Sequence, residues 1–109
     1  MKSRTAIALF AALAFAASSF AADGTAVWNN HCSSCHGADG KGDTKMGKKL
    51  KIKDLTDAAY QASFTDEAAF NAVKIGVKTE AGKTVMKAIE EVTDEEINAV
   101  VVYLRTLKK

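Results

Sequence analysis

The stretch Cys32-Ser33-Ser34-Cys35-His36 decides how the rest of the sequence is interpreted. Two cysteines separated by two residues and followed directly by a histidine form the pattern that attaches haem c. Each thiol adds across one vinyl group of the porphyrin, and this spacing lets both sulfurs reach vinyl groups on adjacent pyrrole rings. The histidine then directs its imidazole at the iron. We therefore expect one covalent haem c, with Cys32 and Cys35 as its thioether residues and His36 as the proximal iron ligand.

Three other interpretations of the two cysteines are weaker. A thiol redox centre of the thioredoxin type needs strands that alternate with helices, and the sequence predicts none. A zinc site lacks its second pair of ligands, since His31 is the only other histidine. A local disulfide between Cys32 and Cys35 would close a very small loop and stabilise little. We expect His31 to lie on the surface or to pack in a loop rather than to bind iron.

The first 21 residues have the layout of a secretory signal peptide. Lys2 and Arg4 provide a positive start, residues 5–17 are almost wholly apolar, and small residues surround the expected cleavage after Ala21. An uncleaved membrane anchor is the alternative, but the apolar run is shorter than the roughly 20 residues needed to cross a bilayer. The expected product is a single domain, residues 22–109, in the periplasm and without a membrane span.

The charge of the chain is balanced overall but unevenly distributed. Loss of Lys2 and Arg4 with the signal peptide lowers the number of basic residues from 15 to 13, which equals the 13 acidic residues. A balanced charge gives no general attraction to nucleic acid or to a membrane surface. Six lysines nevertheless crowd the segment after the haem motif, namely Lys41, Lys45, Lys48, Lys49, Lys51 and Lys53.

The remaining sequence predicts an all-α domain, because no run alternates strictly between apolar and polar residues. We expect a helix from Asp23 to Cys35, a short helix over residues 56–63, and a third helix that begins after the N-cap Thr65 and ends at Gly76. The glycine-containing segments 37–53 and 77–92 are expected to be loops.

The last helix is the clearest predicted element. Thr93 and Glu96 have the spacing of a capping box, in which each side chain binds a backbone N–H of the other residue. The apolar residues that follow recur at helical spacing and predict a buried stripe made of Ile97, Val100, Val101, Leu104 and Leu107.

The second axial ligand of the iron must come from another part of the chain. A methionine thioether is a soft ligand that favours reduced iron, and Met86 and Met46 remain once Met1 is lost with the signal peptide. Met86 follows two predicted helices, so enough chain precedes it to wrap around the haem. Met46 lies in the loop that leaves the attachment site and would have to double back around the haem edge. We favour Met86 and keep Met46, a lysine ligand or an open iron as alternatives.

With these features together, the chain resembles a class I c-type cytochrome of the small bacterial monohaem type. In that family a haem motif near the N-terminus is followed by a methionine from a late loop, and the C-terminal helix crosses the N-terminal one. Gly24 and Trp28 match the family's glycine and aromatic residue in the first helix, and Val100 and Tyr103 match the positions of the last helix that meet them. The resemblance implies one monohaem cytochrome c domain over residues 22–109, with both terminal helices crossing over a covalently bound haem.

Two common family features are absent from this chain. Family members often have a proline after the ligand methionine, where this chain has Lys87. They also often have a proline after the attachment loop, and its carbonyl accepts a hydrogen bond from Nδ1 of the ligand histidine. The corresponding segment here is Met46-Gly47-Lys48-Lys49-Leu50. Any other carbonyl can accept that bond, and those near Gly47 and Lys48 are the candidates.

The resemblance and the expected His36/Met86 iron imply an electron carrier rather than an enzyme, because two protein ligands leave no open position for a substrate. We expect a monomeric periplasmic shuttle that passes single electrons between redox proteins. The lysines that follow the motif are expected either to dock an acidic face of such a partner or simply to form a solvated loop. The alternative function is a five-coordinate haem protein that binds or senses a gas, or a small peroxidase.

Overall fold

The structure is a computed structural model that describes residues 22–109, and the signal peptide expected over residues 1–21 lies outside this part of the chain. The described residues are mostly helical, as expected. In chain order the elements are α1 Gly24–Val27, the π-helical turn η1 Trp28–Cys32, α2 Ser33–His36, α3 Lys45–Leu50, α4 Ala58–Ala62, α5 Asp66–Ile75, β1 Val77–Lys78, β2 Thr84–Met86 and α6 Asp94–Thr106. Within residues 22–109, every helix falls short of the length and apolar character needed to span a bilayer.

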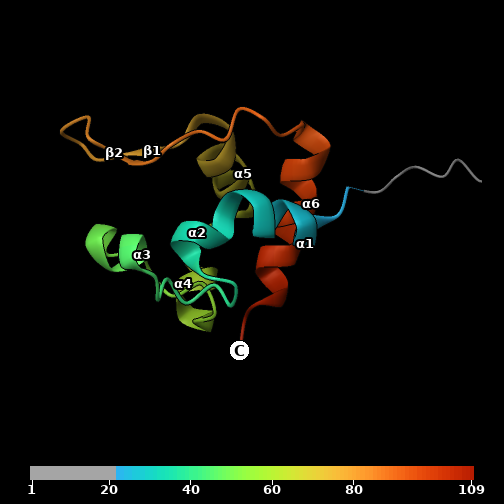
Figure 1. Ribbon diagram of the computed structural model, residues 1–109, viewed down its shortest axis with the longest axis horizontal. Helices are drawn as coiled ribbons and strands as arrows, with labels where there is room; N and C mark the ends of the chain where they lie inside the picture. The colour runs from blue at the N-terminus through green and yellow to red at the C-terminus, as the bar shows by residue number, and fades with distance from the viewer. Residues whose placement is uncertain (1–21) are drawn as a thin grey trace, which may run out of the picture.

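Helices α1 and α6, from opposite ends of the described chain, cross in close contact (Figure 1). Gly24 makes this approach possible, because a Cβ atom built on it would lie 2.8 Å from the carbonyl carbon of Ala99 and 3.0 Å from Cβ of Tyr103. The indole of Trp28 lies against the Tyr103 ring, with centroids 5.6 Å apart. The expected contact of Gly24 and Trp28 with the last helix is therefore confirmed.

The first helix is not the continuous α-helix expected over residues 23–35, because its middle turn is π-helical. Asp23 caps the start, as expected. In η1, however, the N–H of Ser33 donates to the carbonyl of Trp28, five residues earlier. Trp28 and Cys32, the first and last residues of the turn, are both buried. Such π turns frequently occur at functional sites, and this one ends at Cys32, the first cysteine of the motif.

Helix α6 agrees with its sequence signals. The Thr93 hydroxyl accepts from the N–H of Glu96 at 3.2 Å, and the Glu96 carboxylate accepts from the N–H of Thr93 at 3.1 Å, so the capping box is confirmed. The predicted apolar stripe packs into the hydrophobic core, with its first three residues buried and its last two half-buried: Ile97, Val100, Val101, Leu104 and Leu107.

The sequence predicts a loop over residues 37–53. This prediction is wrong, because the segment contains helix α3. Thr44 is its N-cap, and its hydroxyl accepts from the N–H of Gly47 at 2.9 Å. The same hydroxyl donates to the carbonyl of Cys35 at 2.6 Å, which ties α3 to the end of α2. Gly47 fits closely there, because a Cβ atom on it would lie 2.7 Å from that carbonyl oxygen.

Helices α4 and α5 confirm the two helices expected in the middle of the chain. Asp57 caps α4 by accepting from the N–H groups of Ala59 and Tyr60. Thr65 caps α5 by accepting from the N–H of Ala68 at 3.0 Å, and Gly76 follows its last residue with φ +80°. Glycine adopts that backbone conformation without strain, which explains why the helix ends there.

The late loop contains two short antiparallel strands, which the sequence did not predict. Val77 of β1 pairs with Met86 of β2, and a turn that includes Gly82 at φ +82° joins the strands. The N–H of Ile89 then donates to the carbonyl of Val73 at 2.9 Å, which holds the segment after β2 against α5. Met86 is thereby placed on a hydrogen-bonded strand rather than in an irregular loop.

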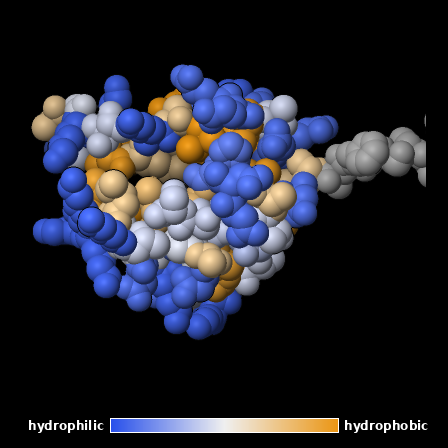
Figure 2. All heavy atoms as spheres, viewed as in Figure 1, coloured by the Kyte–Doolittle hydropathy of each residue, from blue (hydrophilic) through white to orange (hydrophobic). Residues whose placement is uncertain are grey.

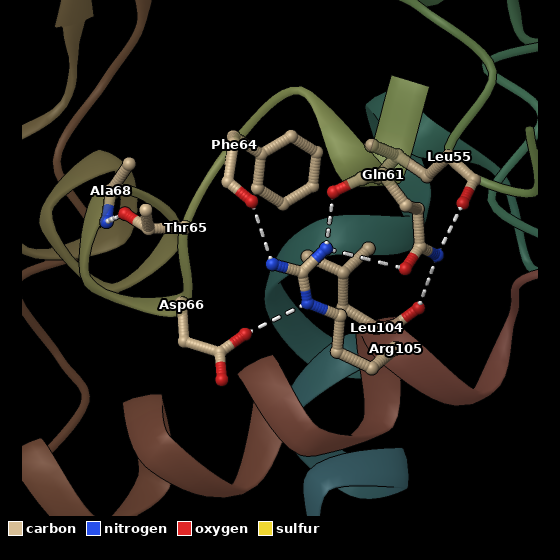
Figure 3. Close-up of polar contacts among 8 residues, drawn as sticks. All are labelled: Leu55, Gln61, Phe64, Thr65, Asp66, Ala68, Leu104 and Arg105. Atoms are coloured by element: carbon tan, nitrogen blue, oxygen red, sulfur yellow. Dashed lines mark hydrogen bonds and ion pairs between the residues drawn. The ribbon is translucent and has the colours of Figure 1, made fainter. Parts of the chain in front are cut away.

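The Arg105 side chain, near the end of α6, links this last helix to the junction between α4 and α5 by hydrogen bonds (Figure 3). Its Nε donates to Asp66 at 2.8 Å, and its terminal nitrogens donate to the carbonyls of Gln61 at 2.6 Å and Phe64 at 2.8 Å. The guanidinium also lies 4.5 Å from the centroid of the Phe64 ring. The side chain of Gln61, only 3% exposed, completes this link by donating to the carbonyls of Leu55 and Leu104.

Candidate functional site

The residues of the haem motif lie on consecutive turns at the end of the first helical region. Cys32 ends η1 and is buried, whereas Cys35 and His36 end α2 and are half-buried. Gly37 then stops the helix with φ +83°, a conformation that favours glycine. His31, which precedes the motif in η1, is also half-buried. The structure thus brings the three expected haem residues together on one short stretch of helix, while the expectation that His31 is not a ligand stays a prediction.

Cys32 and Cys35 are not bridged to each other by a disulfide. Burial raises the pKa of Cys32 to about 11, and the charge of the neighbouring Cys35 adds to the rise. A thiol–disulfide redox centre instead needs a thiol whose pKa is lowered, so these surroundings disfavour that alternative. Across residues 22–109 there is also no group of three or more His, Cys, Asp or Glu side chains that could hold a bare metal ion, as a zinc site requires.

The imidazole of His36 is suited to ligate iron. Burial lowers the pKa of His36, so the ring is uncharged near neutral pH. An uncharged imidazole has one N–H donor and one nitrogen lone pair that is free to bind a metal. Its Nδ1 atom is buried without a hydrogen-bond partner. Buried polar atoms without a hydrogen-bond partner are rare in proteins, so this atom calls for an explanation.

The expected acceptor for Nδ1 of His36 is not found within residues 22–109. The carbonyl of Gly47 accepts from the N–H groups of Lys51 and Ile52, and the carbonyl of Lys48 accepts from the N–H of Lys51. These bonds close the C-terminal end of α3. The two candidate carbonyls named from the sequence are therefore used within α3 and its C-terminal cap, and neither accepts from the imidazole.

Trp28 contacts the motif in a way that the sequence did not reveal. Its indole packs against the His36 imidazole, with ring centroids 5.7 Å apart and ring planes inclined by 40°. Its Nε1–H donates to the carbonyl of Gly37 at 3.0 Å, directly after the histidine. The carbonyl of His36 itself accepts from the N–H of Gly42 at 2.7 Å. Trp28 was expected only to pack between helices, and no sequence signal indicates its second role.

The two candidate methionines lie in different surroundings. Met86 is half-buried and packs against the hydrophobic core, whereas Met46 on α3 is 43% exposed. Met86 also lines a surface cavity of 420 Å³, together with residues from the end of α5 and from the segment after β2. Cys32, Cys35 and His36 do not line this cavity, so it does not join Met86 to the rest of the expected site.

The donor atoms present fit a haem of the c type. Two thiols that are not bridged to each other, Cys32 and Cys35, are available for the two thioether bonds. The neutral ring of His36 supplies a nitrogen ligand from the same helical turn. The order of these residues suits both tasks. The two thiols can form the thioether bonds to the haem, and the imidazole that follows them can ligate its iron.

Comparisons with known proteins agree with this arrangement. A family model described as "Cytochrome c" matches residues 21–108. The search of curated proteins found no match. A solved structure titled "KustC0563 c-type cytochrome" is 33% identical, has a TM-score of 0.68, and covers 80% of this chain and 99% of its own. A point mutant of that protein is 32% identical, with a TM-score of 0.65, and covers 79% of this chain and 99% of its own.

These matches extend over nearly the whole described part of the chain, and the helical fold expected from the sequence is confirmed by them. The expected haem c, and an electron-transfer role based on it, are properties of the matched family. The chain therefore belongs to the cytochrome c family and is a small class I c-type cytochrome with one covalently bound haem c.

Proposed function

We propose that this protein transfers single electrons in the periplasm through a haem that is joined to Cys32 and Cys35 and ligated by His36 and Met86. The observation that carries the proposal is the placement of two thiols that are not bridged to each other and a half-buried imidazole on consecutive helical turns. When bound, the haem supplies an iron that accepts and returns one electron. The residues of the chain hold, orient and shield that iron.

Cys32 and Cys35 have the task of fixing the haem permanently. Cys32 belongs to the same buried cluster as Val27, Trp28 and Val100, so its thioether bond connects the haem directly to the crossing of α1 and α6. A domain of this size has a small hydrophobic core, and a covalent link between core and cofactor adds stability that the core alone does not provide.

Met86 is the better supported second axial ligand. It is half-buried, packs against the hydrophobic core and is held on a paired strand. Met46 lies on α3 with 43% exposure, so a large part of its surface is in contact with water. A His/Met pair raises the reduction potential and leaves no open position on the iron, which suits an electron carrier and leaves no place for substrate turnover.

A comparison of Met86→Ala with Met46→Ala tests the ligand assignment directly. Both variants are matured in a periplasm that contains haem-attachment machinery, and their absorption spectra are recorded with and without carbon monoxide. We expect Met86→Ala to lose the weak far-red band of Met–iron ligation and to bind carbon monoxide when reduced, while Met46→Ala retains the wild-type spectrum. A wild-type protein that already binds carbon monoxide readily contradicts the proposal and favours gas sensing or peroxidase activity.

The lysines after the motif form a basic surface suited to an acidic redox partner. They lie on or next to α3, all are exposed, and they are Lys41, Lys45, Lys48, Lys49, Lys51 and Lys53. Hydrophilic residues cover most of the side of the molecule where α3 lies (Figure 2). One of them, Lys48, pairs with Asp43 at 3.2 Å, but both side chains are more than 70% exposed, so this pair is weak. The others carry positive charge available for steering a partner.

Small ionic reagents test the basic surface without a known partner. We expect oxidation of the reduced protein by anionic ferricyanide to slow as ionic strength rises, because salt screens the attraction. Replacing Lys45 and Lys49 by alanine should reduce that salt dependence, whereas replacing Lys108 and Lys109 at the C-terminus should change it less. Equal effects of the two pairs of substitutions would place the attraction in the net charge rather than in this surface.

The periplasmic location rests on the signal peptide expected over residues 1–21, and the family to which the chain belongs is typically extracytoplasmic. The intact mass of the protein from a periplasmic fraction tests both the cleavage and the attachment. We expect a chain that begins at Ala22 and carries the added mass of one haem. A chain that keeps residues 1–21 in the membrane fraction would contradict this part of the proposal.

A further inference from the structure

The Nδ1 atom of the half-buried His36 side chain is itself buried, yet nothing within residues 22–109 accepts a hydrogen bond from it. A histidine that ligates a metal almost always donates its second ring N–H to an acceptor, and that bond fixes the orientation of the ring. If His36 is the iron ligand, as proposed above, another contact must prevent the ring from rotating about its bond to the iron.

Trp28 provides such a contact. Its indole lies against the imidazole with centroids 5.7 Å apart, and it is only 3% exposed, so it has little freedom to move. On its other side the indole packs against Tyr103 of α6, with centroids 5.6 Å apart. The imidazole therefore packs against an indole that is itself held in place where the two terminal helices cross.

Trp28 also controls the main chain that carries the histidine. Its Nε1–H donates to the carbonyl of Gly37, the residue that follows His36 and turns the chain away from α2 at φ +83°. This bond restrains the backbone directly after His36. One tryptophan thus contacts the ring and restrains the backbone next to it.

We propose that Trp28 is a positioning residue that fixes the plane of the His36 imidazole, the task usually performed by a hydrogen bond to Nδ1. The inference rests on His36 being an axial ligand. The orientation of an axial imidazole sets the anisotropy of the electron paramagnetic resonance (EPR) spectrum of low-spin ferric haem. A residue that holds this orientation therefore has a spectroscopic effect that core packing alone does not produce.

The decisive comparison uses holoprotein variants on the two sides of the indole. Trp28→Leu removes both the ring contact and the hydrogen bond to Gly37, Trp28→Phe removes only the hydrogen bond, and Tyr103→Leu removes the indole's other neighbour without touching His36. All three loosen the crossing of α1 and α6, so each is expected to unfold at lower denaturant concentration than the wild type. Stability alone therefore does not distinguish positioning from packing.

The EPR spectrum of the oxidised holoprotein does distinguish them. We expect Trp28→Leu to show several low-spin signals or one broadened signal, Trp28→Phe to show a smaller shift, and Tyr103→Leu, which keeps the indole against His36, to change the signal clearly less than Trp28→Leu. If Trp28→Leu does not mature, Trp28→Phe decides alone.

Two kinds of failure remain separable. An unchanged signal in the Trp28 variants, or an equal change in Tyr103→Leu, overturns the positioning role and leaves the ligand set intact. A wild-type protein without a low-spin c-type spectrum contradicts the His36/Met86 ligand set, and the role of Trp28 is then overturned with it.

Discussion

Removal of the Arg105 side chain should cost far more stability than removal of its ion-pair partner. The guanidinium donates to two backbone carbonyls, those of Gln61 and Phe64, and to the carboxylate of Asp66. Hydrogen bonds from a charged donor contribute about 1.5–3 kcal/mol each when buried. The Arg105 side chain is 30% exposed, so water partly replaces these bonds in the variant. We expect Arg105→Ala to lower the free energy of unfolding by about 2–3 kcal/mol in total.

The matched variant Asp66→Asn isolates the ion pair. The side chain of Asp66 is 73% exposed, and an exposed pair of this kind contributes roughly 0–1 kcal/mol. Arg105→Lys keeps the positive charge but loses the planar fork that reaches two carbonyls and stacks on Phe64, so it should resemble the alanine variant more than the wild type.

Denaturation of the holoprotein by guanidinium chloride, followed by far-ultraviolet circular dichroism, measures these differences. A domain of this size shifts its melting temperature by about 4–8 °C for each kcal/mol, so thermal unfolding offers a second measure. If Asp66→Asn costs as much as Arg105→Ala, or if Arg105→Ala costs less than about 1 kcal/mol, the carbonyl contacts do not stabilise the junction between α4 and α5.

Three further predictions concern the helix crossing, the last helix and acid stability. Gly24→Val should destabilise the holoprotein by about 1–3 kcal/mol in guanidinium melts, because its side chain meets the Ala99 carbonyl; a wild-type midpoint contradicts the close approach. Thr93→Ala should cost about 1 kcal/mol by removing the cap of α6, and Thr93→Ser should restore most of it; no loss in the alanine variant contradicts the capping role. Hydrogen bonds from Thr56 lower the pKa of Asp54, so its contribution is present above the ordinary pKa of 3.8 and is lost as pH falls through the lowered value. Asp54→Asn should therefore unfold more easily than the wild type at pH 6, with the difference shrinking below pH 3.8; a constant difference contradicts the assignment.

The elements that the sequence predicted are those whose signals are local. Thr93 and Glu96 cap α6 through bonds between residues three apart, and Thr65 and Gly76 mark the ends of α5 in the same way. Each of these interactions involves neighbouring residues, so the sequence contains all the information needed to recognise it. The Cys32-to-His36 stretch belongs to the same class, because its spacing is itself the chemical requirement.

The elements that the sequence failed to predict depend on distant contacts. Gly47 disfavours a helix intrinsically, by about 1 kcal/mol relative to alanine, yet α3 forms because Thr44 bonds to the Cys35 carbonyl and only glycine fits beside it. The strands β1 and β2 have two and three residues, too few for an alternating pattern to be visible.

Within the site, the sequence predicts the donor residues but does not reveal their surroundings. The packing of Trp28 on the imidazole of His36 follows from the helix crossing and from the π-helical turn between α1 and α2, and neither contact is encoded by spacing. The sequence also did not reveal that Nδ1 of His36 lacks an acceptor. The carbonyl of Gly47 is used to close α3, and the sequence did not predict this helix.

Under the proposed His36/Met86 ligation, one iron changes its oxidation state while both of its protein ligands stay in place. A spectroelectrochemical titration of the periplasm-matured protein, carried out in both directions and in the presence of carbon monoxide, tests it most directly. We expect a single one-electron transition that is fully reversible, with low-spin spectra in both oxidation states and no carbon monoxide complex. Hysteresis between the two directions, a high-spin reduced state or formation of a carbon monoxide complex would contradict the account.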